Sequence, residues 1–154
     1  MLFPDLDSDA LYFSMFDSAF AWSRDREHPF KLEGQQWQST EHYYQAMKFN
    51  AGSYQEKIRA AETIEQARKL GKARFKRKRT DWPKVRTTVM TRAIYTVART
   101  YSNVAEELLA TKDTKLVENS QYDYFWGCGR DRRGENHFGK VLMGIRAKLL
   151  DEAI

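Results

Sequence analysis

The spacing of apolar residues predicts a mainly helical chain whose longest helix lies near its middle. Asp81 stands as an N-cap before this segment, and Pro83 is tolerated in the first turn of a helix. Beyond it, apolar side chains recur every four residues along one face, at Val85, Val89, Ala93 and Val97. We therefore expect this helix to form the centre of the core.

The first third of the chain predicts a small β portion followed by a short helix. Residues 11–38 mix aromatic and polar positions in short runs, and Glu33-Gly34 separates two of these runs as a hairpin turn would. Ser39 is then a plausible N-cap for a helix over 41–49. The boundary between the sheet and the helices is thus expected near residue 39.

Further short helices are predicted on both sides of the central one. Ser53 and Thr63 each begin a capping-box pattern, and Gly71 stands where the second of these helices should stop. Another short helix is expected over 104–110, and residues 115–117 look extended. The last helix is marked by apolar positions at helical spacing: Phe138, Val141 or Leu142, Ile145 and Leu149.

Together these elements predict an α+β, predominantly helical single domain spanning residues 1–154, with a small N-terminal β-sheet. A chain of 154 residues is long enough for one substantial core. We also expect a glycine-rich loop over 127–139, which holds four of the eight glycines, to close over the first and central helices.

Composition and motifs exclude several classes of function. The single cysteine, Cys128, cannot form an intrachain disulfide or a multi-cysteine metal site, and no HExxH, CxxC or Walker pattern occurs. We therefore expect no metal and no cofactor. No apolar run approaches the roughly 20 residues of a membrane span, and the acidic segment 1–10 does not read as a secretory signal. A cytoplasmic protein that does not enter membranes is expected.

Charge is concentrated in one segment. Residues 68–86 hold ten Lys or Arg and one Asp, although the whole chain has a net charge of only +5. Such a segment favours a phosphate-bearing partner, either a small nucleotide or a nucleic acid. A solvated basic helix face is the alternative interpretation, and the pattern alone leaves both open.

Candidate chemistry lies on the helix after Ser39. Glu41 falls in its first turn, where the helix dipole favours an ionised carboxylate, and Gln45 and Lys48 follow one and two turns later on the same face. Helix electrostatics alone would also select this pattern. Asp123 and Asp131, on the glycine-rich loop, are candidate partners for Glu41, although Asp in such loops more often accepts backbone N–H bonds.

Three further residues have both a functional and a structural interpretation. Trp82 and Trp126 lie at element boundaries, where a ring could stack on a flat base or fill the core. Asn136 could contact a ligand or could simply cap the last helix.

Three stretches of sequence carry a resemblance to a known family. They are STEHYYQAMKF at 39–49, DW at 81–82 and LVENSQYDYFWGCGRDRRGENHFGKVLMGIR at 116–146. The chain resembles the NADAR family over nearly its whole length. The resemblance implies an enzyme that cleaves a ribose C–N bond, either in unstable ribosylamino-pyrimidine phosphates of early riboflavin biosynthesis or in ADP-ribose attached to guanine in DNA.

The resemblance also implies roles for individual residues. Glu41, Lys48 and Asp123 are the expected catalytic groups, with Glu41 as the essential carboxylate. Lys48 could form a Schiff base with an opened ribose, as an alternative to direct water attack. The expected substrate-binding residues are Ser14, Phe16, His42, Gln45, Lys72, Trp82, Trp126, Gly127, Asp131 and Asn136.

The chain departs from the family pattern at several positions. Met15 stands where the family usually has Asn, so an amide that could bond the ligand is missing. Cys128 replaces an acidic residue, and Arg132-Arg133 replace small ones. The added positive charge favours a second phosphate, as in ADP-ribose, or a nucleic-acid backbone.

Three functions are therefore compared. The leading one is N-glycosidase action on a ribosylamino-pyrimidine phosphate, with Lys72 among the residues that hold phosphate. The second is hydrolysis of ADP-ribosyl-guanine in DNA, which predicts that the basic segment contacts a strand. The third is a sensor that binds an ADP-ribose or NAD-like ligand without turnover.

Overall fold

The computed structural model describes residues 9–16 and 19–153. The chain divides into two compact units. Residues 24–100 form one, called here the α1 unit, and residues up to 23 together with those from 101 onward form the other, called the α6 unit. Most of the acidic segment 1–10 lies outside the described residues. That residues 1–154 form a single domain stays a prediction.

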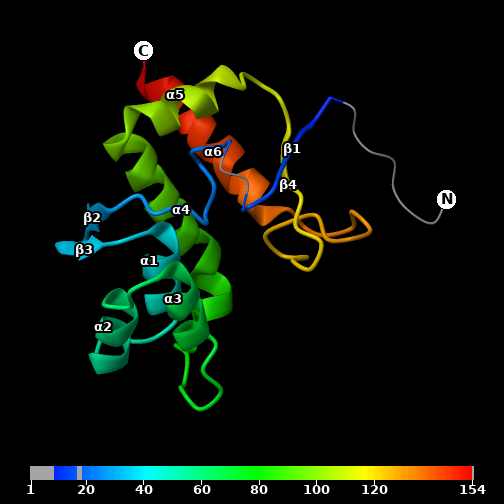
Figure 1. The fold of residues 1–154 in the computed structure, drawn as a ribbon. Helices are drawn as coiled ribbons and strands as arrows, with labels where there is room; N and C mark the ends of the chain where they lie inside the picture. The colour runs from blue at the N-terminus through cyan, green and yellow to red at the C-terminus, as the bar shows by residue number, and fades with distance from the viewer. Residues whose placement is uncertain (1–8, 17–18, 154) are drawn as a thin grey trace. The chain divides into compact units, whose positions relative to one another are not determined.

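The α1 unit begins with a β-hairpin, as the sequence predicts. Strands β2 (Phe30–Leu32) and β3 (Gln35–Trp37) pair antiparallel. Glu33 and Gly34 connect them with φ values of 55° and 80°, the left-handed backbone that a two-residue hairpin turn needs. Phe30 and Trp37 are register partners, and both rings pack edge-on against Tyr43, which fixes the hairpin on the following helix (Figure 1).

Helix α1 (Thr40–Ala46) starts where the sequence predicts. The Ser39 hydroxyl accepts a hydrogen bond from the His42 backbone N–H at 3.1 Å, as an N-cap does. The helix ends at Ala46 rather than at residue 49, because the N–H groups of Lys48 and Phe49 bond to carbonyls three residues back. All seven of its residues are buried, so α1 is a core element.

Helices α2 (Ser53–Arg59) and α3 (Ile64–Gly71) pack on α1 and on each other. The capping box predicted at Ser53 is wrong, because Ser53 is the first helical residue and Gly52 occupies the cap without a side chain. Thr63 does cap α3, and the Gln66 side chain returns to the backbone N–H of Glu62 at 3.0 Å. Gly71 ends α3 as predicted.

Helix α4 (Trp82–Thr100) is the longest helix described and contacts both α1 and β2. Three of the four predicted core positions, Val89, Ala93 and Val97, are buried, whereas Val85 is partly exposed. The central helix of the sequence prediction is thus confirmed.

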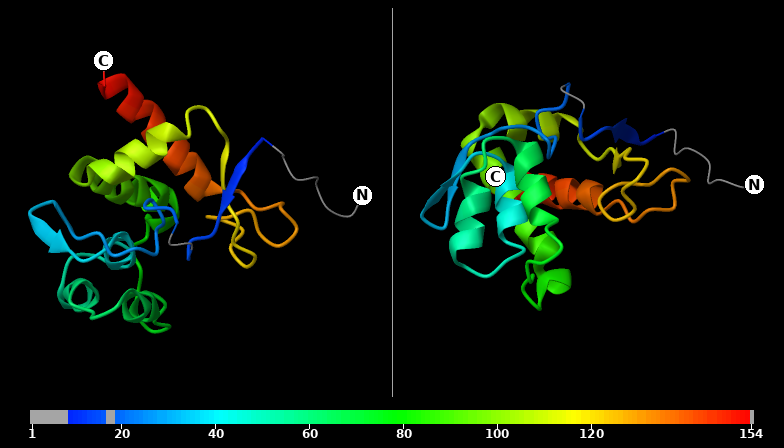
Figure 2. Two further views of the ribbon diagram at one scale, coloured as in Figure 1. Left: turned by 45° about the horizontal axis from the view of Figure 1, so that its top comes forward. Right: turned by 60° about the horizontal axis from the view of Figure 1, so that its bottom comes forward.

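The α6 unit contains a second sheet that the sequence does not predict. Strand β1 (Leu11–Phe13) pairs in parallel with β4 (Leu116–Glu118), more than 100 residues later. Helices α5 (Ser102–Ala110) and α6 (His137–Glu152) complete the unit and contact each other (Figure 2). Buried Phe13 packs edge-on against Trp22 and Phe138.

The predicted fold class, predominantly helical α+β, is confirmed, but in place of one small sheet the described residues form two separate two-stranded sheets. The reason is that β1 takes a distant partner, which local periodicity cannot reveal. Within the described residues, no helix has the length and apolar character needed to cross a membrane.

The cap of α1 gives a stability prediction with an internal control. Ser39→Ala removes the N-cap acceptor, and we expect the free energy of unfolding to fall by about 1 to 2 kcal/mol. Ser53→Ala, at the first helical residue of α2, is expected to change it by less than about 0.5 kcal/mol. Urea unfolding followed by circular dichroism checks both, and equal losses would contradict the assignment of the caps.

Candidate active site

Glu41 lies at the centre of a buried charge cluster in the α1 unit. Its side chain is 1% exposed and is contacted by two guanidinium groups. Arg24 Nη1 lies 3.3 Å from Oε1, and Arg68 Nε lies 3.4 Å from Oε2. The Gln45 side-chain amide donates a further hydrogen bond to Oε2 at 3.1 Å. The carboxylate therefore meets its partners on both oxygens.

This environment keeps Glu41 ionised. Burial by itself raises the pKa of a carboxyl group, because the charged form loses its hydration. The positive charges of Arg24 and Arg68 and the hydrogen bond from Gln45 outweigh that effect, so the pKa of Glu41 is lowered. At neutral pH the site contains a desolvated carboxylate rather than a carboxylic acid.

Arg24 and Arg68 are site residues that sequence reasoning missed. Arg24 is 5% exposed and belongs to the segment before the hairpin, and Arg68 lies on α3 and also pairs with Asp25 at 2.7 Å. In the sequence, Arg68 counted only as part of the basic segment. No local signal sets it apart, because its role depends on the packing of α3 against α1.

Gly71 makes room for Gln45. A Cβ atom at Gly71 would lie 1.9 Å from the Gln45 side-chain oxygen and 3.1 Å from its Cβ. Gln45 is buried and is the residue that donates to Glu41. The glycine predicted to end α3 thus also allows the amide to reach the carboxylate.

Lys48 follows α1 and is unusually buried for a lysine, at 8% exposure. Burial, together with the nearby charges of Lys78 and Lys72, lowers the pKa of its amine to about 8, although the charge of Glu41 opposes them. The amine lies 5.6 Å from the centre of the Tyr44 ring. A substantial neutral fraction near pH 8 makes this amine a potential nucleophile.

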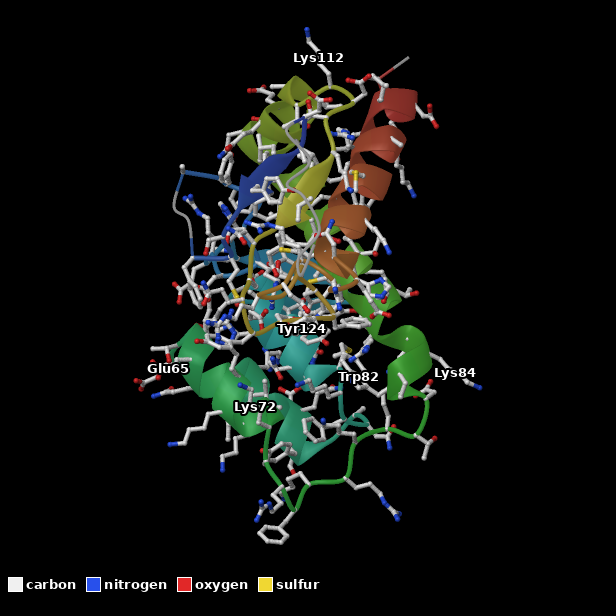
Figure 3. The ribbon with its side chains drawn as sticks, turned by 90° about the vertical axis from the view of Figure 1, so that its right-hand side faces the viewer. Glu65, Lys72, Trp82, Lys84, Lys112 and Tyr124 are labelled. Carbon is white, nitrogen blue, oxygen red and sulfur yellow. The ribbon has the colours of Figure 1, made fainter. Side chains whose placement is uncertain are left out.

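Trp82 lies beside the same tyrosine. Its ring is 5.1 Å from that of Tyr44 and only 6% of the residue is exposed. Lys72, at the end of α3, is exposed (Figure 3). Six of the predicted residues thus belong to the α1 unit: Glu41, His42, Gln45, Lys48, Lys72 and Trp82.

His42 is used within the protein. It is fully buried, with Nδ1 2.7 Å from the Ser39 hydroxyl and Nε2 3.0 Å from the Ala61 carbonyl oxygen. Both ring nitrogens are therefore engaged by the chain itself. This geometry does not support the predicted contact with substrate and gives the residue a structural role instead.

The remaining predicted residues belong to the α6 unit. Asp123 Oδ1 accepts backbone hydrogen bonds from Phe125 at 3.1 Å and Trp126 at 2.7 Å, which is the turn role considered for it. Ser14, Phe16 and Asp123 line a cavity of about 440 Å³ in this unit. The structure thus brings these three residues together, and Phe16 is 70% exposed.

The glycine-rich loop is held by close packing. A Cβ at Gly127 would lie 2.8 Å from Ser120 Cβ, and Asp131 accepts the backbone N–H of Arg133. Asn136 occupies the N-cap position of α6 but does not cap it. Its side chain instead bonds to the Leu116 carbonyl and the Glu118 N–H, each at 3.0 Å, and so ties the loop to β4.

No group of three or more His, Cys, Asp or Glu side chains suited to hold a metal ion occurs among residues 9–16 and 19–153.

Comparison with known proteins decides the family. The model of the NADAR domain matches residues 2–150. The chain belongs to the NADAR family. An N-glycosidase of Nostoc punctiforme is 41% identical over 126 residues, covering 79% of this chain and 80% of the relative.

Two further relatives carry informative names. The N-glycosidase YbiA of Escherichia coli K12 is 35% identical over 137 residues, covering 89% of this chain and 82% of the relative. A riboflavin biosynthesis protein of Vibrio vulnificus is 40% identical over 122 residues, which span 79% of this chain but 33% of that longer protein.

A solved structure agrees with the NADAR assignment. The NMR structure of E. coli YbiA superimposes with a TM-score of 0.86 and 33% sequence identity, covering 96% of this chain and 89% of that one. The NADAR fold expected from the sequence is therefore confirmed.

Because Gly71 contacts Gln45, we expect replacement of glycine by alanine to change the free energy of unfolding in opposite directions at Gly71 and Gly144. Alanine normally stabilises a helix relative to glycine by up to about 1 kcal/mol, which is the gain expected for Gly144→Ala, where open space surrounds the added methyl. Gly71→Ala should instead destabilise by about 1 kcal/mol or more, because Gln45 must leave its place. Urea unfolding of both variants is the measurement, and a gain at both positions would show that Gly71 has no packing role.

Proposed function

We propose that this chain hydrolyses the ribose C–N bond of a phosphorylated ribosylamino-pyrimidine intermediate of riboflavin biosynthesis. The observation that carries the proposal is the buried, ionised Glu41 with a lysine of lowered pKa near it. The names of the relatives, N-glycosidase and riboflavin biosynthesis protein, support both the reaction and the substrate.

At the level of reaction class, the chain is a hydrolase that acts on N-glycosyl bonds, as the curated NADAR relatives are. The enzyme class expected from the sequence is confirmed at this level. The identity of the riboside is the part that we propose.

The chemistry of Glu41 follows from its charge. Loss of a nitrogen base from ribose develops positive charge on the anomeric carbon, and a fixed carboxylate in a desolvated site stabilises that charge. A carboxyl group held ionised by Arg24 and Arg68 is poorly suited to donate a proton. Glu41 therefore stabilises the sugar cation or activates water, and the proton for the base comes from another group.

Lys48 offers a second route. Its neutral amine can attack C1 of the sugar as the C–N bond to the base breaks, and the departing nitrogen takes up a proton from solvent. Opening of the sugar ring leaves an imine between Lys48 and C1, which water hydrolyses to free ribose phosphate and free amine. In this route Glu41 accepts the proton that the amine loses.

Basic residues around Lys48 support a phosphorylated substrate. The charges of Lys78, Lys72 and Arg86 all act on the Lys48 amine, so they lie within electrostatic range of it. A phosphate bound among them would lie close to the reacting sugar. We assign phosphate binding to this group.

A second candidate, action on a nucleic-acid strand, is favoured by a specific feature. Residues 72–78, called here the basic loop, carry five exposed cations and Phe75, which is 95% exposed. The loop returns to the site through a 2.8 Å bond from the Arg79 N–H to the Lys48 carbonyl. An exposed ring among cations suits stacking on an unpaired base beside a phosphate backbone.

Parallel turnover assays test the proposal. Wild-type protein is incubated with a ribosylamino-pyrimidine 5-phosphate and, separately, with an oligonucleotide carrying ADP-ribosylated guanine, and released base is measured by chromatography. We expect turnover of the first substrate, and Glu41→Gln should reduce it about a hundredfold or more, because the amide cannot balance the sugar cation. Glu65→Gln, on the exposed side of α3 (Figure 3), is the matched control.

The other outcomes are equally informative. Turnover of the oligonucleotide alone, falling as salt rises and as Phe75 is changed to Ala, favours the nucleic-acid substrate. Binding of ADP-ribose by both wild type and Glu41→Gln, with no turnover of either substrate, would make the chain a ligand sensor. Circular dichroism of Glu41→Gln is the check that the variant is folded.

The pKa of Lys48, lowered by burial to about 8, predicts the pH dependence of covalent trapping. The amine is protonated below pH 8 and neutral above it, so the yield of borohydride-reduced adduct with substrate should rise between about pH 7 and 9. Mass spectrometry locates the adduct. Lys48→Arg should give none, whereas Lys57→Arg, an exposed lysine on α2, should behave as wild type. Turnover without an adduct at any pH favours direct water attack.

A further inference from the structure

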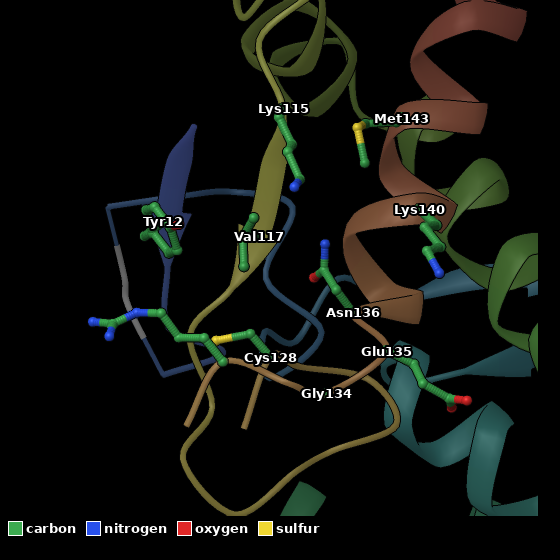
Figure 4. A pocket seen from close by; sticks show the side chains of 10 residues that line it. Tyr12, Lys115, Val117, Cys128, Gly134, Glu135, Asn136, Lys140 and Met143 are labelled. Atoms are coloured by element: carbon green, nitrogen blue, oxygen red, sulfur yellow. The ribbon is translucent and has the colours of Figure 1, made fainter. Parts of the chain in front are cut away.

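The α6 unit contains a cavity of about 290 Å³ that takes no part in the reaction proposed for Glu41 and Lys48, although one residue of its lining, Asn136, is predicted from the sequence to bind substrate. Its buried floor is formed by Val117, Cys128 and Asn136. In Figure 4 the Lys115 side chain extends from beside β4 toward that of Asn136 at the start of α6. We call this cavity the basic pocket.

The walls of the basic pocket are fixed by hydrogen bonds and close packing. Cys128 donates its backbone N–H to the Glu118 carbonyl, and Gly134 donates to Cys128 at 2.7 Å. Alanine could not replace Gly134, because a Cβ there would lie 2.6 Å from the Gly127 carbonyl oxygen. The cavity is therefore a preformed feature of the loop and not a gap between moving parts.

Its electrostatic character is positive. Three cations line it, Lys115 before β4, Arg132 on the loop and Lys140 in the first turn of α6, against a single carboxylate. That carboxylate, Glu135, is bonded to His137 at 3.2 Å. The first amides of α6 bond to carbonyls of the loop, so the side chains, and not the helix end, supply the attraction for an anion.

Apart from the Asn136 amide, the rest of the lining is mainly apolar. Tyr12 and Val117 are register partners in the β1–β4 pair and so present their side chains on one face, and Met143 adds a thioether from α6. Asn136 has both amide atoms engaged by the backbone of β4. An apolar floor under a cationic rim suits a ligand with a flat or apolar body and one anionic group.

We infer that the basic pocket binds a small organic anion, with a phosphate or carboxylate at the Lys115, Arg132 and Lys140 rim and an apolar ring against Val117, Tyr12 and Met143. None of the residues that line this site belongs to the Glu41 cluster. It does not depend on the function proposed above.

Titration with phenyl phosphate, followed by amide NMR of ¹⁵N-labelled protein, tests the inference. We expect saturable shifts at Val117, Cys128 and Gly134. Inorganic phosphate should bind more weakly because it lacks the apolar ring, and phenol should not bind because it lacks the anionic group. The double variant Lys115→Gln/Lys140→Gln should weaken phenyl phosphate by about tenfold or more.

The control carries the same change in charge. Lys84→Gln/Lys112→Gln removes two exposed lysines that point away from the ribbon in Figure 3, and it should bind as wild type does. Equal weakening by both double variants, or shifts confined to residues around Lys48 and Trp82, would overturn the inference. The experiment is repeated in Glu41→Gln, where binding should persist, so its result is independent of whether the chain turns over either substrate.

Discussion

The arrangement of the α1 unit depends on the burial of one negative charge. Glu41 is 1% exposed, and a carboxylate removed from water in this way is tolerated only when cations and hydrogen-bond donors replace its hydration. Arg24, Arg68 and Gln45 do so, and each comes from a different place in the chain. Removing one partner of a buried ion pair typically costs about 3 to 5 kcal/mol, so this cluster constrains how α1 and α3 pack. Because the pKa of Glu41 is lowered by the two arginines, the cluster stabilises the fold above the ordinary pKa, and that contribution is lost as pH falls through the folded pKa.

Residues next to this cluster also have unusual properties. Lys48 is buried near basic side chains, which favours its neutral form, while the charge of Glu41 limits how far its pKa falls. An isolated glutamate is also ionised near neutral pH, but an isolated lysine is fully protonated there, so the partly neutral amine of Lys48 is the unusual group. Perturbed groups of this kind are typical of catalytic sites. Gly71 belongs to this arrangement as well, since only a residue without a side chain leaves space for the Gln45 amide.

Much of this could be predicted from the sequence, and the failures have physical causes. The central helix, the hairpin at Glu33-Gly34 and the Ser39 cap depend on local periodicity and turn chemistry, and all three are confirmed. The pairing of β1 with β4 and the role of Arg68 depend on contacts between distant residues, which no local pattern records. Glu41 and Lys48 fall at helical spacing in the sequence, although α1 ends at Ala46 and Lys48 lies beyond it. His42 is expected to bind substrate only from the family resemblance, and its ring nitrogens bond within the chain. The catalytic roles of these residues stay predictions.

The proposed chemistry requires Glu41 to be a carboxylate throughout the neutral range. The most direct test is a pH titration of its carboxyl carbon by ¹³C NMR, with the signal assigned by its absence from Glu41→Gln. We expect a chemical shift typical of the ionised form at neutral pH and a midpoint below the ordinary value of 4.5. A midpoint well above that value, with a protonated carboxyl near neutral pH, would contradict it and make Glu41 a proton donor instead.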